Sequence, residues 1–431
     1  MEQYNGLNEI LNLQPEENKY ALWGIEFNPF PRSGTSNING SDSVNRTLEP
    51  LDESVLQEIN RFIANALVPN RIDSDDQFMT ATVAGDYGSG KTQLLMYVKA
   101  QLNVIKDSHK FLKPYSIYID NPGGSVLEFI GRVIGKVGEE NLRKYVWNHI
   151  VKEIISDDGI KNQLKPFISS NYSLFPEDQD ACDPYSETNT TSYKKFLDVF
   201  VKYMQPQKRK KFDEIFSGIL RQILNKDAKD PTVGYYFYEF ISSDYGVNKT
   251  WEALTSGNLK QVAGKEADVI KYIVTLLKRE GFTHVFILVD EFEDLTEGRL
   301  SKVQLDNYVH NLRTLLDQQR EWILLFAMNP LALERLKKVS PPLADRISVR
   351  LMSIPNLSTE EIARVFNRYL TLAGYEGDVP FTIEAMDYLR ETCDGNIRRI
   401  LKAAFALFEI AADVKLKVLD KTFVEDNMPS F

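Results

Sequence analysis

The chain has 431 residues, of which 43% are hydrophobic and 26% charged, and its formal net charge is −10. This length allows a large α/β domain and a second unit, and the acidic balance disfavours a uniformly basic nucleic-acid-binding protein. No apolar run approaches the ~20 residues of a membrane-spanning helix, and the polar N-terminus is unlike a signal peptide, so we expect a cytoplasmic protein without membrane contact.

Five short apolar runs predict the buried strands of a sheet. Before them, residues 31–50 are rich in Ser, Asn and Gly and indicate a flexible linker. Residues 55–67 then repeat apolar side chains at helical spacing, and Pro69 ends that helix. Helical patterns between the strands indicate an α/β fold with a parallel sheet covered on both faces. The expected strands are Phe78–Ala84, Tyr115–Asp120, His284–Asp290, Trp322–Met328 and Ile347–Ile354.

One connection, between Asp120 and His284, is far too long for a simple crossover. Most of it has helical patterning, for example at Val126–Val137 and Lys195–Met204. The polar stretch Ser169–Ser192 interrupts the pattern and is expected to be a mobile loop. We therefore predict a helical insertion within the sheet domain.

The segment from Leu357 to Phe431 is again helical in pattern and predicts a small all-helical C-terminal unit. Near its start, Ser358 and Glu361 fit a capping box, in which each side chain bonds to the backbone of the other residue.

Neither cysteine nor histidine spacing supports a disulfide framework or a metal-binding cluster. Cys182 and Cys393 lie far apart, and the four histidines stand in different contexts. One basic cluster, Lys208–Lys211, interrupts the acidic background. Because blocks of like charge are usually solvent-exposed, we expect a solvated face at the start of a helix, with a nucleic-acid contact as the alternative.

The segment Gly85–Thr92 matches the phosphate-binding P-loop pattern G-x-x-x-x-G-K-[ST], and a predicted strand and a helix flank it as the motif requires. Glycines let backbone N–H groups surround phosphate oxygens, and the helix N-terminus adds positive potential. Lys91 is expected at the β- and γ-phosphates of ATP, and the Thr92 hydroxyl at Mg²⁺. The expected nucleotide-binding residues are Gly85, Asp86, Tyr87, Gly88, Ser89, Gly90, Lys91 and Thr92.

Two carboxylates, Asp290 and Glu291, follow the apolar run that begins at His284. The C-terminal edge of a parallel sheet faces the ligand crevice. Asp290 is therefore expected to act on Mg²⁺ through water, and Glu291 to polarise the attacking water as a general base. Such a pair alone could equally be a surface or capping pair, but a P-loop in the same chain favours the catalytic interpretation.

With these motifs in place, the chain resembles the AAA+ ATPases, in particular the initiator clade of origin-recognition-type ATPases and their relatives in transposition and secretion. Further segments carry the resemblance. Trp23–Ile25 with Asn28–Phe30 resembles a segment that packs near adenine, Trp322–Asn329 a strand ending in sensor 1, Leu343–Arg350 an arginine-finger region, and Gly395–Arg398 sensor 2.

The resemblance implies roles for single residues, and three of them have competitors. Asn329 precedes Pro330 and could simply begin a turn. Arg346, placed just before the last strand, is favoured over Arg350 as the arginine finger, and its guanidinium would stabilise charge on the transferred phosphoryl group of a neighbouring subunit. Arg398 is favoured over the adjacent Arg399 as sensor 2, and the other arginine would stay solvated or pair with an acid.

The resemblance divides the chain into an N-terminal segment and linker (1–50), an AAA+ core (51–125 and 281–355), a helical insertion (126–280) and a helical lid (356–431). It implies a Mg²⁺-dependent ATPase that forms ATP-bridged homo-oligomers. No winged-helix domain is expected after the lid, so origin binding is disfavoured.

Two functions compete at this point. The first is a nucleotide-controlled oligomeric switch in a DNA-linked process such as anti-phage defence or transposition. The second is a signalling or scaffold ATPase whose insertion recruits a protein effector without DNA. A small-molecule P-loop kinase is a weaker third alternative, because the lid, Arg346 and Asn329 argue against it.

Overall fold

The computed structural model describes residues 18–33, 53–68, 78–167, 204–228, 230–242, 249–256 and 264–430, together with the single positions Tyr193, Leu197 and Val201. Most of the predicted linker 31–50, the polar stretch Ser169–Ser192 and much of the expected helix Lys195–Met204 lie outside these residues. Cys182 also lies outside them.

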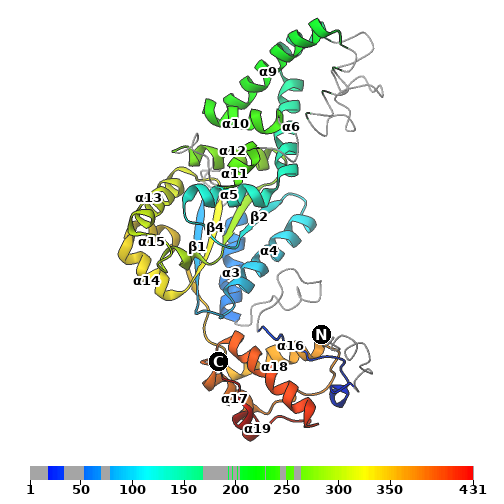
Figure 1. Cartoon of the computed structure of the whole chain (residues 1–431), viewed down its shortest axis with the longest axis vertical. Helices are drawn as coiled ribbons and strands as arrows, with labels where there is room; N and C mark the ends of the chain where they lie inside the picture. Colours follow the sequence, from blue (N-terminus) through cyan, green and yellow to red (C-terminus); the bar gives the residue numbers. More distant parts are fainter. Residues whose placement is uncertain are drawn as a thin grey trace, which may run out of the picture. The chain divides into compact units, whose positions relative to one another are not determined.

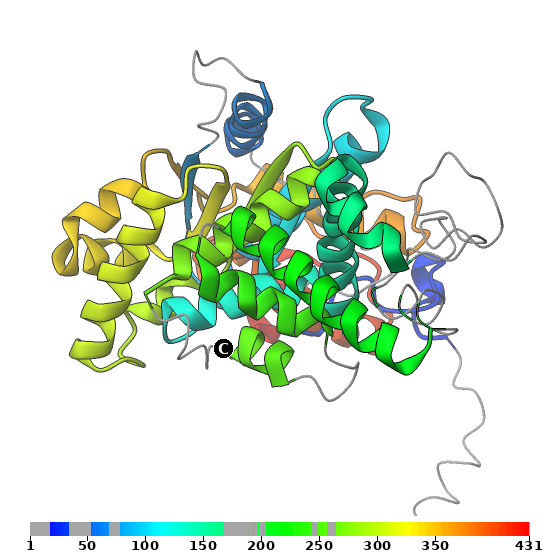
Figure 2. The same cartoon turned by 90° about the horizontal axis from the view of Figure 1, so that it is seen from above.

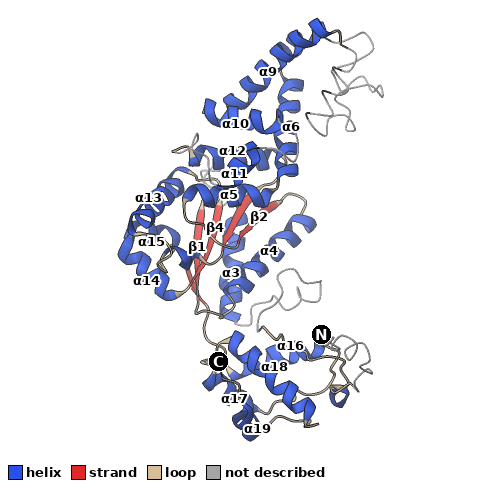
Figure 3. Cartoon of the chain, in the orientation of Figure 1, coloured by secondary structure: helices blue, strands red, loops and turns tan. Residues whose placement is uncertain are grey.

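A five-stranded parallel sheet carries the predicted α/β fold (Figures 1 and 3), with the strand order β2-β3-β4-β1-β5. Strand β2 pairs with β3 from Pro114 opposite His284 to Ile119 opposite Val289, and β3 pairs in parallel with β4. All residues of β3 and β4 are buried, as central strands covered on both faces require. The strands are β1 (Met79–Ala84), β2 (Pro114–Ile119), β3 (His284–Val289), β4 (Ile323–Met328) and β5 (Leu351–Ser353).

The last strand is shorter than the sequence predicted. Instead of Ile347–Ile354, β5 covers only Leu351–Ser353. Ile347 ends a short helix, α15 (Pro341–Ile347), and residues 348–350 form a turn between the helix and the strand. Ser340 caps that helix by accepting a bond from the backbone N–H of Leu343, and proline at the first helical positions is pre-organised for a helix start. The apolar Ile347 was therefore mistaken for the first residue of the strand.

Contacts divide the chain into two compact units. One consists of Met1–Arg61, Val83–Val98 and Met352–Phe431, and the other of Phe62–Thr82 and Lys99–Leu351. The second unit holds β2, β3, β4 and the predicted insertion. Seen from above (Figure 2), its yellow and orange helices gather beside the green helices of the insertion. These yellow and orange helices are α13 (Lys302–Gln318), α14 (Pro330–Val339) and α15.

The insertion is helical, as predicted, and its apolar side chains belong to the same buried core as the sheet. Helix α5 contacts strand β2 on one side and helices α11 and α12 on the other, while α6, α9 and α10 pack together farther out (Figure 1). The helices are α5 (Val126–Val137), α6 (Glu139–Ser156), α7 (Asp158–Leu164), α9 (Pro206–Ala228), α10 (Pro231–Ser242), α11 (Lys249–Ser256) and α12 (Glu266–Arg279).

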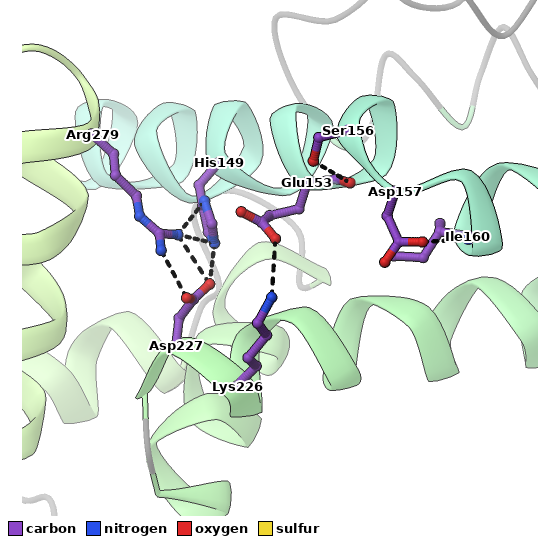
Figure 4. Close-up of polar contacts among 8 residues, drawn as sticks. All are labelled: His149, Glu153, Ser156, Asp157, Ile160, Lys226, Asp227 and Arg279. Carbon is purple, nitrogen blue, oxygen red and sulfur yellow. Dashed lines mark hydrogen bonds and ion pairs between the residues drawn. The ribbon is translucent and has the colours of Figure 1, made fainter.

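A charged network ties three of these helices together (Figure 4). Asp227 at the end of α9 accepts two bonds from Arg279 of α12, at 2.8 and 3.0 Å, and also contacts the buried His149 of α6. Arg279 in turn lies within hydrogen-bond distance of the His149 ring. Because breaking a buried ionic network leaves an uncompensated charge, this network fixes the insertion helices to one another.

The C-terminal helices, called the lid below, have a core of their own, which the N-terminal segment completes. Trp23 stacks on Phe408 with ring centroids 4.1 Å apart, and Phe30 meets Phe366 edge-on at 4.9 Å. The predicted capping box of Ser358 and Glu361 is confirmed. The lid helices are α16 (Thr359–Leu372), α17 (Ile383–Thr392), α18 (Ile397–Asp413) and α19 (Lys421–Asn427).

Candidate nucleotide-binding site

The P-loop lies in the strand–loop–helix context predicted from the sequence. Strand β1 ends at Ala84, and helix α4 (Lys91–Ser108) begins directly after the loop. Gly88 and Gly90 have φ values of +81° and +99°, a backbone conformation that L side chains rarely adopt. The loop therefore needs glycine at these two positions, and it leaves backbone rather than side chains to face a ligand.

The donors of this loop fit a polyphosphate. The Lys91 side chain is only 8% exposed, and its ammonium donates to the carbonyl oxygens of Gly85 and Asp86 at 3.0 and 3.2 Å. The hydroxyl oxygen of Ser89 is buried and has no hydrogen-bond partner among the described residues. An ammonium and an orphaned hydroxyl beside a glycine-rich turn are donors that anionic oxygens would satisfy.

The lid reaches the P-loop within the same compact unit. The Asn396 amide donates to the carbonyl oxygen of Tyr87 at 2.5 Å, and the guanidinium carbon of Arg398 lies 5.2 Å from the centroid of the Tyr87 ring. Arg399 instead pairs with Asp394 at 3.1 Å. Of the two arginines considered for sensor 2, Arg398 is thus the one that contacts the P-loop.

On the other unit, Asp290 directly follows β3 and is 3% exposed. One of its carboxylate oxygens accepts a bond from the Tyr118 hydroxyl and the other from the backbone N–H of Glu291, both at 2.9 Å. Burial, and then the negative charge of Asp290, raises the pKa of Tyr118, so this phenol stays protonated and donates. Tyr118 had no role in the sequence analysis, although its position near the end of a strand is a usable signal.

Glu291 adopts the left-handed conformation, with a φ of +47°. Non-glycine residues seldom do so, and such residues cluster at functional sites. Partial burial, followed by the charges of Asp294, Asp290 and Glu293, raises the pKa of Glu291 above the ordinary value of a glutamate. A raised pKa suits a general base that must take a proton near neutral pH.

This shift predicts an acid limb in the pH dependence of ATP turnover. As a general base, Glu291 would act in its deprotonated form, so turnover should fall as the pH drops through its raised pKa. Replacing Glu293 by Gln removes one of the neighbouring charges, and we expect the acid limb to move to lower pH. The measurement is the ATPase rate of both proteins across pH, with Glu334→Gln on the surface of α14 as a control that leaves the limb in place. A limb that stays at the same pH in Glu293→Gln would contradict this electrostatic account.

A polar network beside these carboxylates also went unrecognised in the sequence. Asp294 accepts a bond from Asn121, which follows β2, and pairs with Arg299 at 2.6 Å. The network joins the loop after β2 to the short helix η4 (Phe292–Leu295), which follows Asp290 and Glu291. Asn121 could have been found by its position, because polar residues just after strands gather at the carboxyl edge of a parallel sheet.

Asn329 directly follows β4 and is the N-cap of the next helix, α14. Its side-chain oxygen caps α14 by accepting from the N–H of Ala332 at 2.6 Å. Its amide donates to Glu297, at 2.9 Å, in the turn after η4. The side chain is therefore linked to the segment that carries the acidic pair.

Arg346 lies in helix α15 and not directly before the last strand, which corrects the predicted position. Its guanidinium forms two bonds with the carboxylate of Asp317 in α13, at 2.5 and 2.9 Å, and a third with the carbonyl oxygen of Pro342. Arg350 is the residue directly before β5, and its carbonyl accepts from Thr82 of β1 at 2.8 Å. The favoured finger residue thus has a carboxylate partner within its own chain.

Within the described residues there is no group of His, Cys, Asp and Glu side chains that could hold a metal ion by themselves. The same part of the chain contains no helix with the length and apolar character needed to cross a membrane.

No protein-family model matches the chain. A curated relative, described as an uncharacterized HTH-type transcriptional regulator of Methanocaldococcus jannaschii, is 32% identical over 148 residues. These residues make up 33% of this chain and 34% of the relative, so the match spans about a third of that protein.

The chain is also similar to several solved structures. One is the ORC2 protein of Aeropyrum pernix in ADPNP–ADP complexes, with a TM-score of 0.45 and 12% sequence identity. The alignment covers 89% of this chain and 70% of the ORC2 chain. The ORC1 protein of the same organism, in complex with DNA, has a TM-score of 0.41 and 11% sequence identity. That alignment covers 96% of this chain and 70% of the ORC1 chain. The CDC6P protein of Pyrobaculum aerophilum has a TM-score of 0.37 and 9% sequence identity, and the alignment covers 87% of this chain and 68% of the CDC6P chain.

Proposed function

We propose that this protein binds ATP with Mg²⁺ and hydrolyses it, as an AAA+ ATPase of the initiator type. The observation that carries the proposal is the P-loop, in which positive-φ glycines, the inward Lys91 ammonium and the orphaned Ser89 hydroxyl form one cradle. The residues Gly85–Thr92 would hold the phosphates through backbone N–H groups and Lys91. Thr92 and Asp290 would hold Mg²⁺, which would neutralise the phosphate charge.

The strand order supports assigning hydrolysis to the acidic pair. Strands β3, β4 and β1 are consecutive in the sheet, and they lead into Asp290, Asn329 and the P-loop respectively. Parallel strands end at a common edge, where ligands of such sheets bind. Glu291 would accept the proton of the attacking water, and its raised pKa fits that task. Asn329 would orient that water or the phosphate from the next strand end.

We propose further that the ATP site is completed by a second copy of the chain, with Arg346 as the finger. Arg346 now pairs with Asp317 of its own chain. On assembly, its guanidinium would have to leave this carboxylate or bind the carboxylate and the phosphoryl group together. Charge complementarity at an interface can supply such an exchange, because a phosphoryl group carries more negative charge than one carboxylate.

Mixing variants tests this arrangement. Arg346→Ala should lower the ATPase rate by about 10³-fold, the lower end of the effect of an arginine finger. The Lys91→Ala protein, inactive through its own P-loop, should restore activity when mixed with Arg346→Ala, because each supplies what the other lacks. Arg350→Ala, tested in the same way, is the matched alternative, and Asp317→Asn controls for loss of the ion pair alone. An Arg346→Ala protein that hydrolyses ATP at the wild-type rate would end the finger assignment.

For the biological role, we propose a nucleotide-controlled oligomeric switch in a DNA-linked process such as anti-phage defence or transposition. ATP would favour the assembled state and hydrolysis would release it. The basic cluster Lys208–Lys211 is exposed in the first turns of α9, as predicted, and offers one place for a phosphate backbone. The insertion as a whole could instead recruit a protein effector, which is the alternative. A cytoplasmic location and the division into core, insertion and lid also stay predictions.

The ATPase rate with and without double-stranded DNA, at low and moderate salt, separates these roles. Stimulation that falls steeply with salt is expected for the DNA-linked switch, because phosphate contacts release counterions. A quadruple alanine variant of Lys208–Lys211 shows whether the cluster contributes. ATP-dependent assembly without any DNA effect would favour the effector-recruiting ATPase. Particle imaging with a slowly hydrolysed ATP analogue would show subunit number and bound DNA together.

A further inference from the structure

The side chain of Tyr87 has no part in the backbone cradle of the P-loop, yet it is 74% exposed and meets the lid. Position 87 is one of the variable positions of the P-loop pattern, so phosphate binding itself does not require an aromatic residue there. In this chain the face of the Tyr87 ring lies beside the guanidinium of Arg398, 5.2 Å from its carbon to the ring centroid. A guanidinium at this distance from an aromatic face is held by a cation–π interaction.

Asn396 connects the same two segments through the backbone. Its side-chain oxygen caps α18 by accepting from the N–H of Arg399 at 3.2 Å, and its amide donates to the carbonyl oxygen of Tyr87 at 2.5 Å. One side chain therefore fixes the first turn of α18 and bonds it to the P-loop. Because the cap and the bond use different atoms, the two contributions can be separated by substitution.

Gly88 permits this close approach. A Cβ atom at Gly88 would lie 2.9 Å from the Cβ of Arg398 and 2.9 Å from the side-chain oxygen of Asn396, both shorter than real Cβ contacts. Position 88 therefore favours glycine for two reasons. Its φ of +81° is rare for other residues, and a side chain there would clash with the adjacent lid.

Arg398 has donors left for a ligand. Its Nε is buried and has no hydrogen-bond partner among the described residues, and the ring of Tyr87 uses only the face of the guanidinium. A buried N–H without an acceptor costs free energy, which an anionic oxygen placed against it would recover. The ring and the bond from Asn396 restrict where this arginine can point, so less freedom is lost when it binds.

We propose that Tyr87 and Asn396 form a latch that holds the first turn of α18 on the P-loop and orients Arg398 for the third phosphate of a nucleoside triphosphate. The latch makes the protein prefer ATP over ADP, because only the triphosphate offers Arg398 its acceptor. This inference rests on the proposed function, since it presupposes that the P-loop binds nucleotides.

The test is the ratio of ATP to ADP affinity, measured by equilibrium binding without turnover. Tyr87→Leu keeps an apolar side chain but removes the ring face, and we expect the preference for ATP to fall about two- to fivefold, the effect of one cation–π contact at an exposed site. ADP affinity should fall less than ATP affinity, because ADP lacks the phosphate that Arg398 contacts. Tyr87→Phe, which keeps the ring, should restore the preference. Asn396→Ser keeps a capping oxygen but loses the donor to Tyr87, and it should reduce the preference as well.

Hydrogen exchange of the protein without nucleotide gives a second readout. In Tyr87→Leu and Asn396→Ser we expect faster exchange in the P-loop and in the first turn of α18, and unchanged exchange in α12, which lies in the other unit. An equal loss of ATP and ADP affinity, or an unchanged ratio with unchanged exchange, would overturn the latch while leaving nucleotide binding in place. A wild-type protein that binds neither nucleotide would instead refute the proposed function, and with it the role of the latch in choosing ATP.

Discussion

Replacing Lys91 by Ala is expected to abolish ATP binding at concentrations that saturate the wild-type protein. Lys91 is a buried cation of the P-loop, and its ammonium donates to the carbonyl oxygens of Gly85 and Asp86. Hydrogen bonds to charged groups contribute about 1.5–3 kcal/mol each. Since one ammonium can serve two phosphates, we expect the Kd to rise by ~100-fold or more, as measured by equilibrium binding of a fluorescent ATP analogue.

The matched control is Lys99→Ala, which removes a lysine two turns farther along α4 and should leave the Kd unchanged. Because Lys91 also supports the loop through two carbonyl oxygens, thermal unfolding of both variants is needed to show that the fold is intact. A folded Lys91→Ala protein that binds ATP with wild-type affinity would remove the basis of the proposed function.

Replacing Glu291 by Gln is expected to separate binding from hydrolysis. The amide cannot accept the proton of the attacking water, so turnover should fall by about 10²–10⁴-fold, the usual contribution of a general base. The Lys91 ammonium and the P-loop backbone are untouched, so the Kd for ATP should stay within about twofold of the wild type. Single-turnover hydrolysis and equilibrium binding on the same preparation check both statements.

Glu334→Gln on α14 serves as the matched control for a neutralised glutamate, because its exposed carboxylate pairs with the exposed Lys337. If ATP holds copies of the chain together, Glu291→Gln should also accumulate the assembled state, which size-exclusion chromatography with ATP would show. Wild-type turnover in Glu291→Gln would assign the proton transfer to another group, and Asp294, a buried carboxylate three residues later, would be the next candidate.

The sequence alone determined the parts whose chemistry depends on neighbours along the chain. The P-loop is such a part, because strand, glycines, lysine and helix follow one another without a gap between Phe78 and Leu102. The capping box of Ser358 and Glu361 is another, since both bonds close within one turn. The buried strands β3 and β4 were equally readable, because a strand covered on both faces needs a continuous apolar run.

Local patterns were misleading where a helix and a strand share an apolar composition. Ile347 belongs to α15, and only the serine and the two prolines at residues 340–342 signal that a helix starts there. For the same reason the place of Arg346 in a helix, opposite Asp317 from α13, could not be read from the linear motif. The two residues are 29 positions apart, and no periodicity relates them.

Only the tertiary structure decided which of two adjacent arginines contacts the P-loop, and which residues support the acidic pair. Arg398 and Arg399 have the same chemistry, and the direction of each side chain depends on how the lid packs. Arg398 contacts the Tyr87 ring, whereas Arg399 pairs with Asp394. Tyr118 and Asn121 meet Asp290 and Asp294 across more than 170 residues, because β2 and β3 are neighbours in the sheet. Parallel pairing of this kind joins distant segments by backbone hydrogen bonds, which leave no pattern in the sequence of either segment.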